Sequence, residues 1–263
     1  MEMRAFAERI FFGESLGDKL AGPVSGWEAL SDEEPGEAMA WEAPTRRGDL
    51  AIAARDERLS FPHPQNFGDA EMAARALHTF AIHELMAVEM MAFALLAFPD
   101  APAKFRSGLA RLISDEQRHT QMYVERLSEL GVRFGELPLN DHFHRCGHSL
   151  TTPLKWICAM NLTFEQANLD HAPYFADWFR KVGDEASAEL LDEIYHDEIQ
   201  HVGFGARWLR EWSEEGSTFE TYVASLTFHN EPERARGDDF DEAARKKAGL
   251  DDDFVAQMAK LQD

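Results

Sequence analysis

The sequence predicts an all-α protein built around a bundle of four long helices, with a long crossover between the second and the third. Long segments carry apolar residues at helical spacing and end at proline or glycine. Two of these segments carry the same pattern, Asp-Glu-x-x-His, at residues 115–119 and 197–201. A further carboxylate precedes each pattern at a similar distance, Glu84 in the first half and Glu165 in the second. The chain therefore looks like one helical hairpin used twice.

Composition limits the class of protein. With 263 residues, 44% of them apolar, the chain can bury a large core, and it has no apolar run of eighteen residues that would predict a membrane span. Residues 1–9 carry charges where a signal peptide needs an apolar core, so we expect a cytoplasmic protein. Cys146 and Cys158 are too few for a four-cysteine metal centre. A net charge of -22 disfavours nucleic-acid binding.

Residues 1–66 are predicted to form an arm that packs on the bundle. A short amphipathic helix fits Arg4 to Phe12, and glycine and proline residues then divide the segment into loops and short pieces. A disordered tail is the alternative, but the segment carries apolar anchors that disorder does not need. These anchors are Phe11, Phe12, Leu20, Trp27, Trp41 and Phe61.

The first hairpin is predicted within residues 67–215, which form the bundle. Its first helix runs from about Asp69 to Phe98, where Pro99 stops it. Its second helix runs from about Pro102 to Leu130, before a glycine. Candidate ligands and apolar residues share one stripe of this second helix: Phe105, Leu109, Leu112, Glu116, His119 and Tyr123.

Residues 131–152 are long enough to cross from one end of the bundle to the other. This link contains His142, His144, Cys146 and His148, which would be the donors of a second metal site. Their spacing does not match a zinc motif, so an ordinary loop is the favoured interpretation.

The second hairpin begins with a helix that starts near Pro153 and kinks or ends at Pro173, followed by a helical stretch at 174–182. The fourth helix is predicted at about 185–212. Residues 216–263 are predicted to form a C-terminal extension whose last helix covers about 252–261. We interpret the basic residues of this extension as a surface with ion pairs four residues apart, rather than as an anion or partner contact. They are Arg234, Arg236, Arg245, Lys246 and Lys247.

Each hairpin offers two carboxylates to face its Glu-x-x-His pair. In the first hairpin the turn is centred near residues 100–101, so Glu116 should face residue 84 or 85, which selects Glu84 over Glu89. In the second hairpin the offset between the halves makes Glu165 the counterpart of Glu84 and so selects it over Asp170. The predicted metal ligands are Glu84, Glu116, His119, Glu165, Glu198 and His201.

Other residues near these ligands receive supporting roles. Asp115 and Asp197 are well placed to accept the free ring N–H of a metal-bound histidine. Glu89 and Asp170 would lie beside the site or along a channel to it. Core packing is the favoured role of Tyr123 and Tyr195, with a redox or hydrogen-bonding role as the alternative. The remaining helix histidines are expected at the surface or in packing: His78, His83, His171 and His196.

The first copy of the motif, Asp115-Glu116-Gln117-Arg118-His119, is similar to the Asp-Glu-x-Arg-His motif of diiron monooxygenases in the ferritin-like superfamily. The second copy has Gln200 where arginine would stand. Residues 83–85, 98–102, 115–119 and 197–202 further resemble a bacterial ferritin-like family of unknown function, a distant relative of a tRNA-modifying diiron hydroxylase. The resemblance implies a ferritin-like bundle with a diiron site of four carboxylates and two histidines, and it implies no substrate.

We therefore expect an O2-activating oxidoreductase with two metal ions, a hydroxylase or oxygenase of a small molecule. Hard oxygen donors with imidazole favour iron, with manganese or a mixed pair as alternatives. O2 would be a co-substrate, and an external electron donor is needed because the sequence has no flavin or nicotinamide fingerprint. The alternative functions are ferritin-type iron oxidation and storage, tRNA hydroxylation and a metal-free interaction protein. The sequence assigns no oligomeric state.

Overall fold

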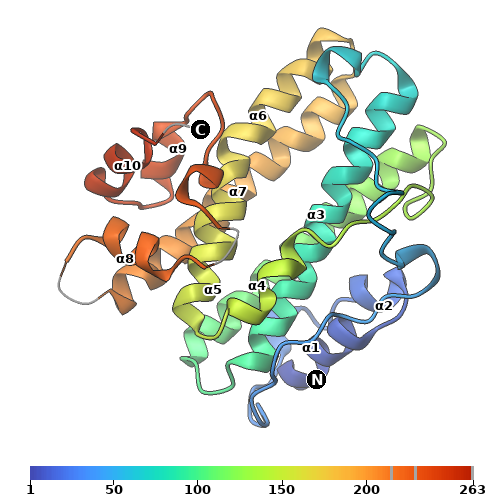
Figure 1. Ribbon diagram of the computed structural model, residues 1–263. Helices are drawn as coiled ribbons and strands as arrows, with labels where there is room; N and C mark the ends of the chain where they lie inside the picture. Colours follow the sequence, from blue (N-terminus) through green and yellow to red (C-terminus); the bar gives the residue numbers. More distant parts are fainter. Residues whose placement is uncertain (214–215, 228–229, 262–263) are drawn as a thin grey trace. The chain divides into compact units, whose positions relative to one another are not determined.

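The computed structural model describes residues 1–213, 216–227 and 230–261, and within these residues the chain forms helices and no β-strand (Figure 1). The prediction of an all-α fold is confirmed. The chain divides into two compact units, Met1–His148 and Ser149–Asp263. The predicted division into an arm, a bundle and a C-terminal extension stays a prediction.

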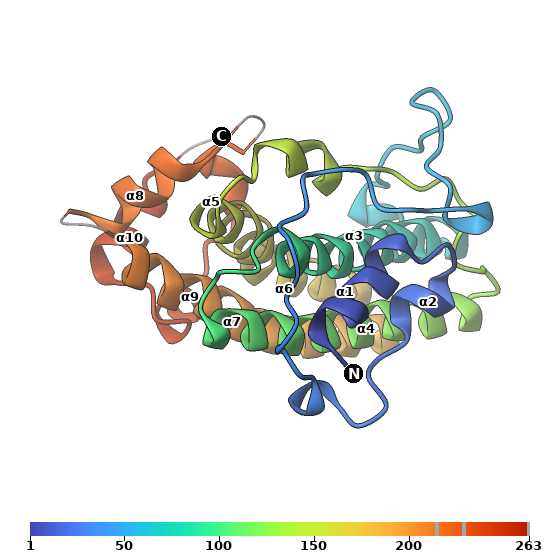
Figure 2. The ribbon, with the colours of Figure 1, turned by 90° about the horizontal axis from the view of Figure 1, so that it is seen from below.

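The first unit is built on a hairpin of two long helices. Its elements are α1 (Met3–Phe12), α2 (Leu16–Leu20), the 3-10 turns η1 (Trp27–Ala29), η2 (Gly48–Leu50) and η3 (Pro64–Asn66), the long helices α3 (Ala70–Ala97) and α4 (Ala103–Glu129), and η4 (Phe143–Ser149). The side chain of Asp69 caps α3 by accepting hydrogen bonds from the backbone N–H groups of Glu71 and Met72. Helix α1 packs along α3 (Figure 2), and its Phe6, Ile10 and Phe11 are fully buried.

Helix α3 is apolar on nearly every face. By length and composition it could cross a membrane, but 83% of its most apolar stretch of 18 residues is buried inside the protein. Burial of this kind is what a central helix of a packed core requires. The two ligand candidates on α3, Glu84 and Glu89, are therefore buried charges that need partners.

The second unit contains the other hairpin and the shorter helices that follow it. Its elements are α5 (Pro153–Ala159), the π-helical turn η5 (Met160–Glu165), α6 (Gln166–Lys181), α7 (Glu185–Trp212), α8 (Thr218–Ser225), the 3-10 turn η6 (Pro232–Ala235), α9 (Glu242–Lys247) and α10 (Asp252–Met258). Helices α6 and α7 pack against each other along their length (Figure 1). The turn between them contains Gly183, whose φ of 85° places it in the left-handed region that glycine favours.

The sequence predicts a kink or an end of the helix at Pro173. The kink stays a prediction, but the helix does not end at this proline. Helix α6 continues through it to Lys181. Proline removes one backbone donor, but a helix packed along a neighbour can tolerate that loss because packing stabilises the remaining turns. The predicted stretch at 174–182 is therefore the second half of the same helix.

Candidate metal centre

The first hairpin brings together three residues that can bind a metal ion. Glu84 comes from α3, and Glu116 and His119 come from α4. His119 Nδ1 lies 3.6 Å from Glu84 Oε2 and 3.7 Å from Glu116 Oε2. All three residues are buried. This group, the first triad, is the one that hairpin geometry predicts, with Glu84 and not Glu89 beside the Glu-x-x-His pair.

The first triad is electrostatically unfavourable without a cation. Burial and the neighbouring Glu116 carboxylate raise the pKa of Glu84 well above its usual range. Two carboxylates this close in a buried place resist ionising together, because each charge disfavours the other and neither is well solvated. A divalent cation would favour both ionised forms, so the arrangement suits metal binding.

The second hairpin holds a matching set of residues, the second triad. Glu165 ends the π-helical turn η5, and Glu198 and His201 lie three residues apart on α7. One candidate ligand atom from each residue lies within 4.8 Å of the others, and His201 Nδ1 is 3.3 Å from Glu198 Oε2. The three residues are buried. The nearly constant offset between the halves of the sequence thus corresponds to the same kind of group in each unit.

Glu198 shows how one carboxylate of the second triad is arranged. Asn168 Nδ2 donates a hydrogen bond to Glu198 Oε1 at 3.0 Å. The other oxygen, Oε2, is buried and accepts no hydrogen bond from the part of the chain that the structure describes. A buried carboxylate oxygen normally has a partner, and a cation would provide one.

The donor chemistry of both triads fits a divalent ion. Each triad supplies two carboxylates and one imidazole, and these ligands suit iron or manganese. Two ionised carboxylates also balance the charge of one divalent ion. Buried carboxylate and histidine groups that could hold a metal ion are therefore present in the protein.

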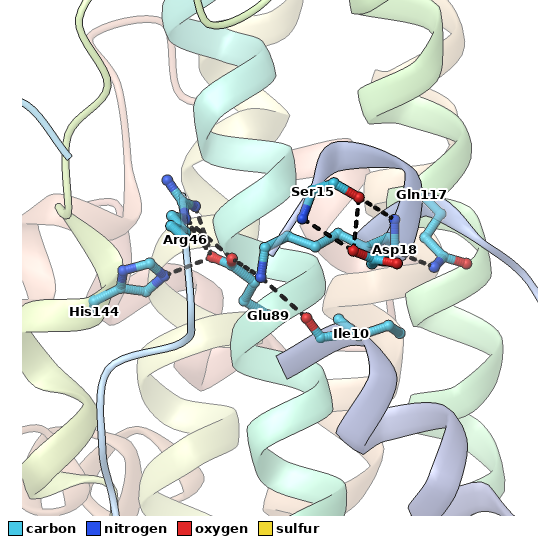
Figure 3. A network of polar contacts seen from close by, with 8 residues as sticks. Ile10, Ser15, Asp18, Arg46, Glu89, Gln117 and His144 are labelled. Carbon is cyan, nitrogen blue, oxygen red and sulfur yellow. Dashed lines mark hydrogen bonds and ion pairs between the residues drawn. The ribbon is translucent and has the colours of Figure 1, made fainter. Parts of the chain in front are cut away.

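Glu89, the other buried glutamate of α3, is contacted by basic side chains from the N-terminal residues and the link (Figure 3). Lys19 Nζ lies 2.7 Å from Glu89 Oε1. Arg46 donates to both carboxylate oxygens, from Nε at 3.0 and 3.2 Å and from Nη2 to Oε2 at 2.6 Å. His144 Nε2 lies 2.9 Å from Glu89 Oε2. Burial alone would raise the pKa of Glu89, but these partners outweigh it and hold the pKa well below its usual range. Glu89 therefore anchors other segments to α3.

Asp170 is the counterpart of Glu89 in the second unit and has the corresponding role. Arg245 donates two hydrogen bonds to its carboxylate, at 2.7 and 2.8 Å. The backbone N–H groups of Gly237 and Asp241 donate to it at 2.9 and 2.7 Å. Both Asp170 and Arg245 are buried, so the prediction that Arg245 belongs to a surface of ion pairs is wrong. The reason is that its partner lies on a different helix, far away in the sequence, which local spacing cannot indicate.

The predicted roles of the nearby aspartates and tyrosines have mixed support. Asp115 lies 3.9 Å from Arg111, and the roles of Asp115 and Asp197 beside metal-bound histidines stay predictions. Tyr123 is buried, with its ring 6.0 Å from that of Phe80, as core packing predicts. Tyr195 is only partly buried, and its hydroxyl donates to Asp241 at 2.7 Å. Burial and this hydrogen bond raise the pKa of Tyr195 to about 12.

The histidines outside the triads have identifiable contacts. His144 belongs to the Glu89 ion pairs, and Cys146 is buried with its thiol donating to the Phe143 carbonyl. The ring of His83 stacks on Phe143 at 5.2 Å. His78 is buried, and its Nε2 accepts a hydrogen bond from the backbone N–H of Gly135 at 3.1 Å. Burial lowers the pKa of His78 to about 4.

Sequence reasoning missed the basic side chains that contact Glu89 and Asp170. Lys19 and Arg46 lie in the predicted N-terminal arm and His144 lies in the predicted link, both of which consist of loops and short pieces in the sequence. No periodic pattern links them to α3, because each is distant in the chain from its partner on that helix. The only available signal was the presence of two extra carboxylates on apolar helices, which had to be paired with something.

Comparison with known proteins places the chain in a family without assigning an activity. Neither a curated protein nor a solved structure matches it, so the likeness to ferritin-like proteins rests on the motifs quoted above. The model of one family, described as Protein of unknown function (DUF455), matches residues 18–256. That match covers most of the sequence, and the chain therefore belongs to this family.

Proposed function

We propose that the protein is a dimetal oxidoreductase in which the two triads hold two divalent ions, preferably iron, in one centre. One observation carries this proposal: each hairpin buries the same set of two glutamates and one histidine. Charged residues with no function are not expected to recur on buried helix faces at a nearly constant offset. Each set instead supplies two carboxylates and one imidazole, which are suitable ligands for a divalent cation.

The inventory of ligands supports a shared centre over two unrelated sites. Dimetal carboxylate bundles use a glutamate from each of two helices and a Glu-x-x-His pair from each of the other two. Glu84 and Glu165 supply the single glutamates, and residues 116–119 and 198–201 supply the pairs. Four carboxylates and two neutral imidazoles balance the charge of two divalent ions, so no further charged protein ligand is required.

Two bound iron ions would supply O2 activation, which supports hydroxylation or oxygenation of a small organic substrate. The chain's own residues hold the ions and exclude bulk water, since the candidate ligands are buried. Electrons would come from an external donor, because the sequence contains no flavin or nicotinamide fingerprint and no cysteine cluster.

Metal analysis of the protein, expressed with iron and manganese available, tests the proposal. We expect two ions per chain in the wild-type protein. Glu84→Ala and Glu165→Ala should each lose at least one ion, because each removes a carboxylate from one triad. Glu125→Ala is the matched control, since Glu125 is an exposed glutamate of α4, and it should keep both ions.

Circular dichroism should show that all the variants keep their helices. A wild-type protein without stoichiometric metal would overturn the proposal. So would ligand variants that retain as much metal as the Glu125→Ala control, because the triads would then not be the site.

A further inference from the structure

The π-helical turn η5 carries the metal-ligand candidate Glu165 at its last position. A π turn contains one residue more than an α-helical turn over the same length, and such turns are uncommon without support and frequent at functional sites. In η5 the polar side chains of Asn161 and Thr163 are fully buried. Buried polar groups in such a turn must be held by specific partners.

Thr163 connects the turn to two other elements. Its hydroxyl donates to the carbonyl of Cys158 in α5 at 2.8 Å, and it lies 2.9 Å from the hydroxyl of Tyr222 in α8. Thr163 has a single hydroxyl proton, and the Cys158 carbonyl can only accept. In the contact between the two hydroxyls Tyr222 must therefore be the donor. Burial raises the pKa of Tyr222 well above its usual range, so this donor keeps its proton.

The opposite side of the turn is fixed to α7. Asn161 Nδ2 donates to the backbone carbonyl of His201 at 3.2 Å. Gly205, one turn further along α7, permits the close approach, because a Cβ atom there would lie 2.6 Å from the Cβ of Asn161. The turn is thus held between the helix that carries His201 and the helix that carries Tyr222.

We propose that Thr163 and Tyr222 are positioning residues that keep the π turn in place and so keep Glu165 in the second triad. This inference rests on the proposed metal centre. Without the hydrogen bonds, the residues of the turn can relax to α-helical spacing. That relaxation rotates Glu165 by about 100° relative to α5 and takes its carboxylate out of the triad.

The role extends to the C-terminal part of the chain. Tyr222 is fully buried, and its ring packs against Phe254 of α10 at 5.3 Å and Phe219 of α8 at 6.2 Å. These aromatic contacts fix the position from which the Tyr222 hydroxyl donates. Residues that lie outside the predicted bundle therefore help to position a ligand inside it.

Equilibrium titration with Co2+, followed by visible absorption, tests the inference on the full chain. Tyr222→Phe removes the donor while keeping the ring, and Thr163→Val removes the hydroxyl while keeping the shape. Each should weaken the binding of at least one ion by about tenfold or more and alter its absorption spectrum, as expected when a group that orients a ligand is lost.

Two further variants separate positioning from general destabilisation. Thr163→Ser keeps the hydroxyl and should bind both ions with wild-type affinity. Tyr195→Phe removes another tyrosine hydroxyl of the same unit, which donates to the Asp241 carboxylate, and should also keep wild-type affinity. Urea unfolding of the metal-free proteins measures how much stability each substitution removes.

The outcomes distinguish this inference from the proposed function. If the wild-type protein binds two ions and both Tyr222→Phe and Thr163→Val match its affinity and spectrum, the positioning role is overturned and the metal centre stands. Equal losses in Tyr222→Phe and Tyr195→Phe would also overturn it. A wild-type protein that binds no Co2+ would overturn both. If Thr163→Val does not fold, Tyr222→Phe alone decides the result.

Discussion

Arg46 and Arg47 are neighbours in the chain, but Arg46 makes a buried ion pair and Arg47 an exposed one. The Arg46 side chain is 3% exposed and pairs with the fully buried Glu89, whereas the Arg47 side chain is 72% exposed and pairs with the exposed Glu14. Removing one member of a buried pair leaves an uncompensated charge and typically costs about 3–5 kcal/mol. An exposed pair contributes about 0–1 kcal/mol.

Lys19 and His144 still contact Glu89 when Arg46 is removed, so its charge keeps part of its compensation. We therefore expect Arg46→Gln to lower the free energy of unfolding by clearly more than Arg47→Gln, which should change it by less than about 1 kcal/mol. Urea denaturation of both variants checks this prediction. Limited proteolysis should cut within residues 1–66 faster in Arg46→Gln, because the anchor to α3 is weakened. Equal stabilities of the two variants would show that the Glu89 ion pairs do not anchor the N-terminal residues.

His78 should give the protein a pH-dependent stability in the mildly acidic range. Burial lowers its pKa from 6.5 to about 4, so between these pH values the unfolded chain binds a proton that the folded chain does not. The stability contributed by neutral His78 is complete above pH 6.5 and is lost as the pH falls towards 4, by up to about 3 kcal/mol.

The variant His78→Gln keeps an acceptor for the Gly135 backbone N–H but cannot titrate in this range. Urea denaturation from pH 7 to pH 4 should show that the variant loses less stability than the wild-type protein. The comparison isolates His78, since all other titrating groups are shared. Parallel pH profiles for the two proteins would contradict the prediction.

At the scale of residues, the triads could be predicted and their neighbours could not. Glu84 and Glu116 follow from helical spacing and from the position of the hairpin turn, which are local properties of the sequence. The pairing of Glu89 with Arg46 is a contact across 43 residues, part of them in loops, and no periodicity specifies it. The sequence offers both Glu84 and Glu89 as the glutamate that faces Glu116 and His119. The structure favours Glu84, because Glu89 is paired with Lys19, Arg46 and His144 instead.

At the scale of elements, the buried pair of Asp170 and Arg245 holds η6 and α9 to α6. Arg245→Met should lower the free energy of unfolding by about 3–5 kcal/mol, because Asp170 would keep its buried charge without its cation. The double variant Asp170→Leu, Arg245→Met removes both charges and should recover much of that loss. A double-mutant cycle in urea checks this. A double variant no more stable than Arg245→Met would show that the packing of Arg245, and not its charge, supports these elements.

Helix boundaries were predictable where the sequence contains strong end signals. Asp69 caps α3, Pro99 follows its end, and Gly131 and Gly183 take the left-handed conformation after α4 and α6. The π turn η5 was not predictable, because its residues keep an apolar pattern that also fits an α-helix. The helix end predicted at Pro173 is absent for a related reason. Local propensity favours an end there, but packing of α6 against α7 overrides that propensity.

At the scale of the whole molecule, the two units follow one plan. Each has a helical hairpin with a buried triad and, further along the helix from its single glutamate, a second carboxylate held by a buried arginine. The second carboxylate is thus neutralised by protein, whereas the triad suits a metal ion. The family match over residues 18–256 includes all of these residues.

Titration with Mn2+, followed by electron paramagnetic resonance, tests the central claim most directly. If the two triads form one dimetal centre, the wild-type protein binds two Mn2+ per chain and gives the spectrum of a spin-coupled pair. Glu165→Ala should abolish that coupled spectrum, and Glu125→Ala should preserve it. Two bound ions with the spectrum of isolated Mn2+, or no stoichiometric binding, would contradict the claim.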